Sequence, residues 1–425
     1  MSAANLLTKQ FGRLALTTAC TIGIMTLSIN PLFAGDREKA KFIHDRIAGV
    51  PPDNTTLADM TADITGGNVD AAVATAMANK NFLNVTVKNM VIPWTNKNQT
   101  VFAPLNDAAA TIIGYVRDGY DFRGILSDNR IYIGNDPALS GFPYGTNDND
   151  HYIRMEYLDL DLRSVLTETT QSSSSTLSLP AEAVAGVTTT RQSAKEFFYL
   201  GTNRAMFRFT MMNYLCTDLE QIMDITRTND RIRQDVSRGP GGDSDVFLNN
   251  CIGCHAGMDG MAGAYAYYDY NMPNLNADNE PDQATGNITY NTAPQTYDLE
   301  GTPVTSRVVK KYRHNLNNFI YGYVSTDDSW KNYWRTGINA KLQWASNTPQ
   351  TPSVGSGAAA LGQELANTGA FARCQAVKVY RTVCHNDPDE ATLQSLVTSF
   401  IGSTYDMRTV FTESVKDCMT KNPNL

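Results

Sequence analysis

Apolar side chains recur at helical spacing in the first part of the chain. Ile43 and Ile47 stand one helical turn apart among charged residues, and a glycine and two prolines end this run. The alanine-rich run 69–80 and residues 108–116 have the same periodicity. These patterns predict an N-terminal helical region over residues 35–170.

The second half of the chain has stretches rich in large apolar residues. Residues 194–233 contain several phenylalanines and methionines at helical spacing, and such residues are more often core than cofactor contacts. Helical spacing returns near the C-terminus at 358–366, 370–383 and 390–401. We therefore predict a mainly α fold that ends in a C-terminal helical region over 309–425.

Two stretches are poor in large apolar residues. Residues 171–192 are rich in serine and threonine, which is typical of a solvated polar linker. Residues 271–308 are dominated by Asn, Asp, Pro, Thr and Gln, and they predict a surface loop or small insertion.

Between these two stretches lies the motif Cys251-Ile252-Gly253-Cys254-His255. Two cysteines at this spacing bond the vinyl groups of one haem, and the histidine that follows ligates its iron. The motif predicts one covalent haem c, held by Cys251 and Cys254, with His255 as the proximal iron ligand. We expect a cytochrome-c-like helical region embedded in a larger helical protein with long loops, and we assign it to residues 193–270.

Zinc is the main alternative for the same three side chains. A zinc site needs a fourth ligand and usually a second close pair of cysteines or histidines. No such pair follows the motif, which favours haem.

The N-terminus has the layout of a signal peptide. Lys9 and Arg13 precede an uncharged stretch, 14–29, and Pro31 and Ala34 follow it. The stretch is shorter than the roughly 20 apolar residues that span a bilayer. We expect residues 1–34 to be removed on export, no transmembrane span after cleavage, and a periplasmic or secreted protein, the setting in which bacterial haem attachment occurs.

The second axial position of the iron is less well defined by the sequence. Met258 and Met261 follow His255 too closely to reach the opposite face of a haem. Candidate distal ligands are His314, Met272 and His151, with the first two favoured. A filled position favours electron transfer, and an open one allows small molecules to bind.

Four cysteines remain once the motif and Cys20 are set aside, and an exported protein is expected to pair them as disulfides. Cys384 and His385 resemble half of a second haem motif, but its first cysteine is missing, so a disulfide is the better prediction for Cys384. A helix over 374–384 would span about 15 Å, beyond the roughly 7 Å that a disulfide tolerates. If that helix is continuous, Cys374 and Cys384 each bond Cys216 or Cys418.

Net charge narrows the range of partners. The chain has 35 basic and 43 acidic residues, for a formal net charge of −8. Nucleic acid is therefore excluded as a partner, and a redox partner protein with positive charge around its own redox centre is expected. No serine hydrolase elbow, Walker loop or dinucleotide-binding fingerprint is present.

Several runs of sequence resemble the planctomycete-type cytochrome-c-related proteins, in which domains of unknown function surround one C-x-x-C-H followed by Met-Asp. Met258 and Asp259 hold the Met-Asp positions here. The resemblance implies a mostly helical, secreted or periplasmic haem protein of undefined substrate. It covers roughly residues 115–415 and rests on DFRGILSDNRIYIG, FFYLGTNR, CIGCHAGMDGMAGAYAYYDY and LANTGAFARCQAVKVYRTVC.

The leading functional hypothesis from the sequence is single-haem electron transfer in the periplasm. One alternative is a haem enzyme with an open distal site that reduces peroxide or oxidises a substrate. Another is a structural or assembly protein in which the haem stabilises the fold. The motif is common to all three, and the oligomeric state stays open.

Overall fold

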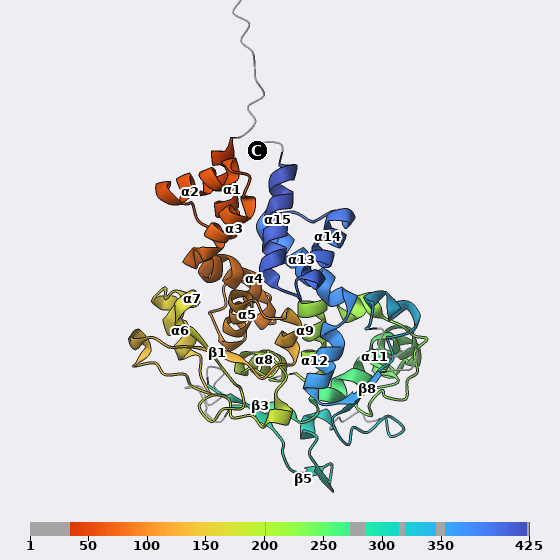
Figure 1. Cartoon of the computed structure of the whole chain (residues 1–425). Helices are drawn as coiled ribbons and strands as arrows, with labels where there is room; N and C mark the ends of the chain where they lie inside the picture. The colour runs from red at the N-terminus through yellow and green to blue at the C-terminus, as the bar shows by residue number, and fades with distance from the viewer. Residues whose placement is uncertain (1–34, 200, 273–284, 314–318, 346–352, 423–424) are drawn as a thin grey trace, which may run out of the picture.

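The computed structural model describes residues 35–199, 201–272, 285–313, 319–345, 353–422 and 425, and the predicted signal peptide lies outside them. The described chain is mainly helical with a few short antiparallel strands, which confirms the mainly α fold class. The architecture is an elongated body in which the first and last helices lie at one end (Figure 1).

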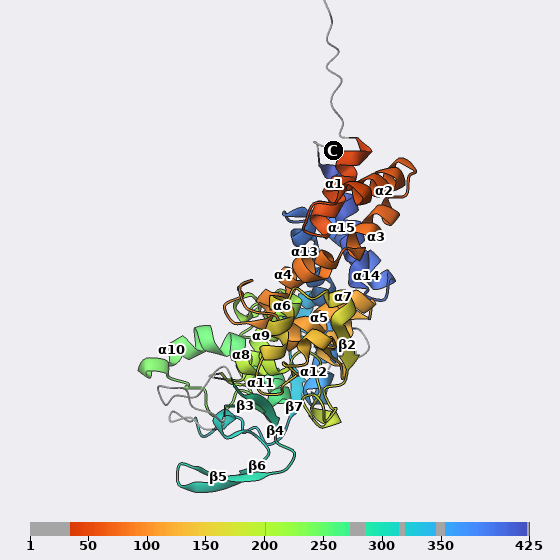
Figure 2. The same ribbon diagram turned by 90° about the vertical axis from the view of Figure 1, so that its left-hand side faces the viewer.

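That end of the molecule joins segments from the two ends of the described chain. The first helices pack against the last ones, with α1 contacting α15 and α13 (Figures 1 and 2). Apolar faces at helical spacing explain this packing, since Ile43 and Ile47 of α1 are both fully buried. The six helices are α1 (Asp36–Ile47), α2 (Asn54–Thr65), α3 (Val69–Ala78), α13 (Gly369–Cys384), α14 (Glu390–Gly402) and α15 (Met407–Lys421).

The remaining helices form the larger part of the body. Helix α5 runs through its centre, and every residue from Ala108 to Val116 is buried. Asn106 caps this helix by accepting a hydrogen bond from the Ala109 backbone. The α-helices of this part are α4 (Lys88–Val91), α5 (Asp107–Asp118), α6 (Asp150–Tyr157), α7 (Leu162–Val165), α8 (Arg191–Phe197), α9 (Asn203–Leu215), α10 (Ser244–Val246), α11 (Ile252–Ala262) and α12 (Ala358–Ala366).

The strands form four separate two-stranded antiparallel sheets. In the first, Ile131 lies opposite Thr169. The β5–β6 hairpin projects from the body at the end away from α1 (Figure 2). The pairs are β1 (Ile131–Gly134) with β2 (Leu166–Thr169), β3 (Tyr268–Asn271) with β4 (Asn287–Tyr290), β5 (Gln295–Leu299) with β6 (Thr302–Ser306), and β7 (Ser329–Asn332) with β8 (Ser353–Ser356).

Most helices predicted from periodicity are confirmed, but the helical stretch predicted over 194–233 is longer than the helices found there. The stretch 194–233 contains α8 and α9, and α9 ends at Leu215 because Cys216 adopts a left-handed conformation with φ of 52°. Between Cys216 and Arg233 the only helical element is the short 3-10 turn Leu219–Ile222. The predicted loop 271–308 also proves to contain β4, β5 and β6, whose polar, half-exposed strands lack a strong alternating pattern.

The prediction of a solvated linker over 171–192 is wrong for much of its length. Gln171 is fully buried, and its amide nitrogen donates to the Gly186 carbonyl at 2.8 Å. Its amide oxygen accepts a hydrogen bond from the Thr189 hydroxyl at 2.9 Å. A polar composition predicts solvation only when its hydrogen bonds go to water, and here the side chains satisfy one another inside the protein.

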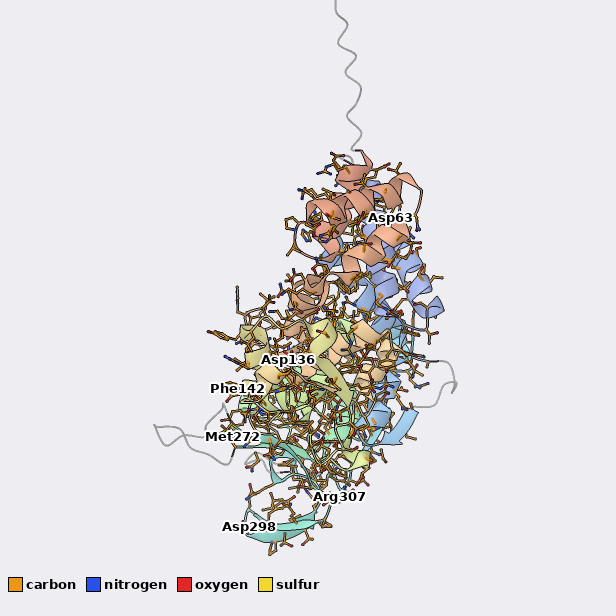
Figure 3. All side chains as sticks on the ribbon, turned by 60° about the vertical axis from the view of Figure 1, so that its left-hand side comes forward. Asp63, Asp136, Phe142, Met272, Asp298 and Arg307 are labelled. Atoms are coloured by element: carbon orange, nitrogen blue, oxygen red, sulfur yellow. A yellow bond between two sulfur atoms is a disulfide. The ribbon has the colours of Figure 1, made fainter. Side chains whose placement is uncertain are left out.

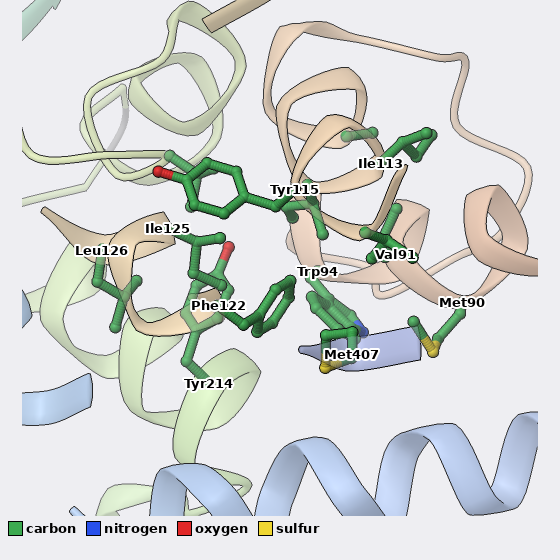
Figure 4. Close-up of a cluster of buried hydrophobic side chains, with 14 of the residues drawn as sticks. Met90, Val91, Trp94, Ile113, Tyr115, Phe122, Ile125, Leu126, Tyr214 and Met407 are labelled. Atoms are coloured by element: carbon green, nitrogen blue, oxygen red, sulfur yellow. The ribbon is translucent and has the colours of Figure 1, made fainter. Parts of the chain in front are cut away.

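Aromatic side chains from distant segments meet in the main core (Figure 4). Trp94 and Tyr214 contact edge to face, with ring centroids 6.0 Å apart. Phe122 packs near Phe371 of α13 at 6.3 Å. This core therefore ties the C-terminal helices to the central body. Among the described residues, no helix combines the length and the apolar character needed to cross a bilayer.

Lys378 of α13 brings a charged group against this core, and it yields a first prediction. Its Nζ lies 3.8 Å from the centroid of the Trp94 ring and donates a hydrogen bond to the Asn213 carbonyl. Burial, followed by repulsion from Arg381, lowers the pKa of Lys378 from 10.5 to about 7. Attraction to the aromatic face favours the charged amine, but desolvation outweighs it.

The unfolded chain therefore binds more protons than the folded chain between a pH of about 7 and about 10, so the free energy of unfolding should rise with pH in this window. Replacing Lys378 with methionine should flatten that rise. Urea unfolding of both proteins at several pH values within the window provides the measurement. Parallel pH profiles for the two proteins would contradict the lowered pKa.

Candidate functional site

Helix α11 carries the C-x-x-C-H motif and is held close to its neighbours by glycines. Cys251 ends the short π-helical turn Phe247–Cys251, and α11 follows directly. A Cβ at Gly257 would lie 2.0 Å from the Trp334 ring, and one at Gly260 would lie 2.6 Å from the Lys331 carbonyl of β7. Only glycine permits this approach, so the backbone under the motif is fixed against β7.

The two motif cysteines are unbonded and partly exposed. The Cys254 thiol lies 3.6 Å from the Leu219 carbonyl, to which it donates a weak hydrogen bond. Burial, followed by the nearby charges of Glu220 and Asp218, raises the pKa of Cys254 to about 11. This thiol is therefore protonated at neutral pH, whereas metal binding and thiol exchange use the thiolate.

Within the described ranges, no group of three His, Cys, Asp or Glu side chains is placed to hold a metal ion. The structure thus offers no set of ligands for the zinc alternative in these residues, since a structural zinc site needs four.

His255 is oriented by a buried carboxylate. Its Nδ1 donates a hydrogen bond to Asp259 Oδ1 at 3.0 Å, one helical turn further along α11. Because an ionised carboxylate only accepts, this contact places the proton on Nδ1. In the described part of the chain, nothing forms a hydrogen bond with Nε2, and the His255 side chain is 22% exposed. When His255 is neutral, the proton on Nδ1 leaves the lone pair on Nε2, and Nε2 is then the atom that can ligate a metal.

Asp259 is held in turn by arginine. The Arg204 guanidinium makes a two-pronged contact with its carboxylate, at 2.7 and 3.0 Å. The Arg233 backbone amide donates to Oδ2 at 3.1 Å. Burial alone would raise the pKa of Asp259, but Arg204 and His255 outweigh it and hold the pKa far below its usual range. The carboxylate is therefore ionised at any physiological pH.

The hydrogen-bond network around Asp259 includes a second carboxylate, Asp235, which contacts both arginines. Asp235 receives hydrogen bonds from Arg204 at 2.6 and 2.7 Å and from Arg233 at 2.7 and 3.1 Å. Arg233 also donates to the Asn203 side chain at 2.8 Å, and Asn203 donates to the Ala262 carbonyl at the end of α11. Two arginines and two aspartates thus form a buried, locally neutral cluster behind His255.

The arginine–aspartate cluster has no signature in the sequence as a whole. Arg204 and Asp259 fell within the runs that carried the family resemblance, but neither was assigned a role there. A histidine and an aspartate four residues apart on a helix share one face, and this spacing was the signal for the pair. Arg233 and Asp235 lie in an irregular segment, and no local pattern indicated their role.

Apolar side chains are exposed around the motif. Ile225 is 58% exposed and lies next to Gly253, while Leu248 is 51% exposed and precedes Cys251 by about one helical turn. A flat apolar macrocycle needs such a surface, two accessible thiols on one edge and an unprotonated imidazole nitrogen. The residues present therefore fit a haem c bonded to Cys251 and Cys254 and ligated by His255.

The three residues predicted as distal iron ligands lie in different environments. His151 is buried, its Nδ1 contacts the Phe142 carbonyl at 2.7 Å, and its Nε2 accepts from the Gly134 amide at 2.8 Å. Both nitrogens are occupied by backbone groups, so His151 is withdrawn as a distal candidate. Met272 follows β3 and is half-buried against the main core (Figure 3). His314 lies outside the described residues.

Two disulfides link the remaining cysteines. Cys216 bonds Cys374 with a Cα–Cα distance of 5.3 Å, and Cys384 bonds Cys418 at 5.7 Å. Helix α13 is continuous from Gly369 to Cys384, so the prediction that Cys374 and Cys384 pair with other cysteines is confirmed. Because Cys384 is bonded, it has no thiol for a second haem.

Comparison of the chain with protein-family models, with curated proteins and with solved structures found no match.

Proposed function

We propose that this protein is a periplasmic or secreted single-haem c-type cytochrome that transfers electrons. Cys251 and Cys254 anchor the haem, and His255 is its proximal ligand. The observation that carries the proposal is the pairing of His255 Nδ1 with buried Asp259 beside two unbonded thiols. A bound haem would supply one-electron chemistry at its iron.

The surrounding residues have distinct parts in this proposal. Asp259 fixes the tautomer and the ring plane of His255, and a carboxylate acceptor on Nδ1 makes Nε2 a stronger electron donor. Arg204 and the Arg233 amide share the charge of that carboxylate and moderate its effect. The glycine contacts with Trp334 and β7 keep the helix in place while charge changes nearby.

One observation also favours the enzyme alternative. Asp259 accepts from Nδ1 of His255 and raises the basicity of its Nε2, and a bound haem with a free coordination position would then supply chemistry with peroxide. Because both ring nitrogens of His151 contact backbone groups, His151 would not fill that position. Reduced protein with a low-spin, six-coordinate spectrum that ignores carbon monoxide would contradict the enzyme alternative. A five-coordinate spectrum would contradict simple electron transfer.

A pyridine haemochrome assay on the exported protein tests the cofactor itself. We expect a spectrum with two thioether bonds and an intact mass equal to the mature polypeptide plus one haem. Replacing Cys251 with alanine should remove the two-thioether spectrum and leave no stable pigment, because Cys254 alone can form at most one bond to the macrocycle.

The matched control removes a pair of cysteines elsewhere. A Cys384→Ala/Cys418→Ala variant loses a disulfide but should keep the two-thioether spectrum. The proposal fails if the correctly exported protein is colourless, or if its mass is that of the polypeptide alone.

A further inference from the structure

A cleft of about 620 Å³ is lined in part by Gln221 and Ile222 of the short turn Leu219–Ile222, and none of the three C-x-x-C-H side chains lines it. One wall is a single face of α13, on which Ala370, Arg373, Val377 and Arg381 follow one another at helical spacing. The other walls come from the end of α9, the 219–222 turn, the turn Gly337–Leu342 and Leu393 of α14. Its volume is that of a site for a small organic molecule.

The charge of this cleft is opposite to that of the chain. The whole protein has more acidic than basic residues, 43 against 35. The cleft is nevertheless lined by three cations, Lys341, Arg373 and Arg381, and by no aspartate or glutamate. Such a concentration of one sign in a concave surface focuses its potential and attracts ions of the opposite sign.

The carboxylates that pair with these cations stand outside the cleft and face water. Arg373 contacts Glu390 at 2.9 Å, but the Glu390 side chain is 73% exposed. Arg381 contacts Asp387, whose side chain is 67% exposed. Lys341 donates to the Gln221 carbonyl at 3.2 Å, and in the described part of the chain no carboxylate lies within ion-pair distance of it. Solvent-screened pairs of this kind leave the cations able to bind another anion.

The floor of the cleft is apolar and rigid. Ala370 and Val377 are partly exposed apolar residues of its lining, and the lining residues Leu215, Ile222 and Leu342 are nearly fully buried, with exposures of 2%, 0% and 5%. The Cys216–Cys374 disulfide also lines the cleft and joins α9 to α13 across it. A site that is already held in shape loses less conformational freedom when a ligand binds.

We propose that this cleft binds an organic anion with an apolar body, a medium-chain carboxylate being the simplest member of the class. The negative group is held at the rim by Lys341 and Arg373, and the hydrocarbon lies against the partly exposed side chains of Ala370 and Val377. The site is separate from the proposed haem site and does not depend on it.

Isothermal titration of the full exported protein with octanoate tests the proposal. Acetate carries the charge without the apolar body, and octyltrimethylammonium carries the apolar body with the opposite charge. We expect saturable one-to-one binding of octanoate, at least tenfold tighter than either control ligand, since each lacks one of the two contacts.

Two variants locate the site. Lys341→Gln should weaken octanoate binding by about threefold to fivefold, as expected for a partly screened ion pair. Ala370→Phe should abolish it by filling the cleft without a change of charge. Lys41→Gln, which removes the same charge on α1, should leave the affinity unchanged, and thermal unfolding of each variant verifies that it is folded.

The proposal is overturned by three results: no saturable binding of octanoate, equal binding of octanoate and octyltrimethylammonium, or wild-type affinity in folded Ala370→Phe protein. Binding of octanoate to a colourless sample would support the cleft while contradicting the haem proposal, so the two can fail separately.

Discussion

Replacing Asp259 with alanine will lower the free energy of unfolding by about 3–5 kcal/mol, the usual cost of breaking a buried ion pair from one side. The Asp259 side chain is 0% exposed, and Arg204 beside it is 15% exposed. Without Asp259, Arg204 and Arg233 share the single carboxylate of Asp235, so one positive charge in a buried cluster loses its partner. His255 and the Arg233 amide also lose their acceptor.

Urea denaturation followed by circular dichroism gives this free energy. Glu390→Ala is the control, because it also removes a carboxylate from an arginine but at a side chain that is 73% exposed, and we expect stability close to wild type. Arg204→Met/Asp259→Leu should recover part of the loss, since both charges are removed together. Equal stability of Asp259→Ala and wild type would show that the cluster contributes nothing.

Loss of the Cys216–Cys374 disulfide should have an effect of similar size. Its cysteines are 158 residues apart in sequence, against 34 for Cys384–Cys418. A cross-link that closes a longer loop removes more entropy from the unfolded chain, which predicts a loss of about 5 kcal/mol for the first disulfide and about 4 kcal/mol for the second.

Double alanine variants of each pair, unfolded in urea without reductant, compare the two. The Cys216→Ala variant should have nearly the same free energy of unfolding as the Cys216→Ala/Cys374→Ala variant, because the disulfide is lost in both. If the variant without Cys384–Cys418 is the less stable of the two, native packing rather than loop entropy determines how much each disulfide contributes to stability. The octanoate affinity of the Cys216→Ala/Cys374→Ala variant also reports whether the disulfide keeps the cleft in shape.

The elements that depend on local chemistry could be predicted from the sequence. The helices at 36–47, 358–366 and 390–401 were visible as apolar faces, because helical periodicity is a property of neighbouring residues. The C-x-x-C-H motif at Cys251 could also be found from the sequence, because five consecutive residues define it. Even the exclusion of a Cys374–Cys384 bond needed only the rise of one helix.

Other features depend on segments that meet only in the folded chain. The choice of Cys216 rather than Cys418 as the partner of Cys374 is one, and the burial of the polar stretch around Gln171 is another. His151 could have been a ligand by composition, but its two ring nitrogens contact the backbone of Gly134 at the end of β1 and of Phe142. In each case the residue that makes the decisive contact is too far away in the sequence for helical or strand periodicity to indicate it.

The proposed haem site combines both kinds of information. The two cysteines that would anchor the haem and the histidine that would ligate its iron follow from the sequence alone, because covalent attachment needs a fixed local spacing. Only the tertiary structure placed Arg204, Arg233 and Asp235 around Asp259, and with them the orientation of His255. A buried charge is stable only beside its partners, and those partners come from three separate segments of the chain.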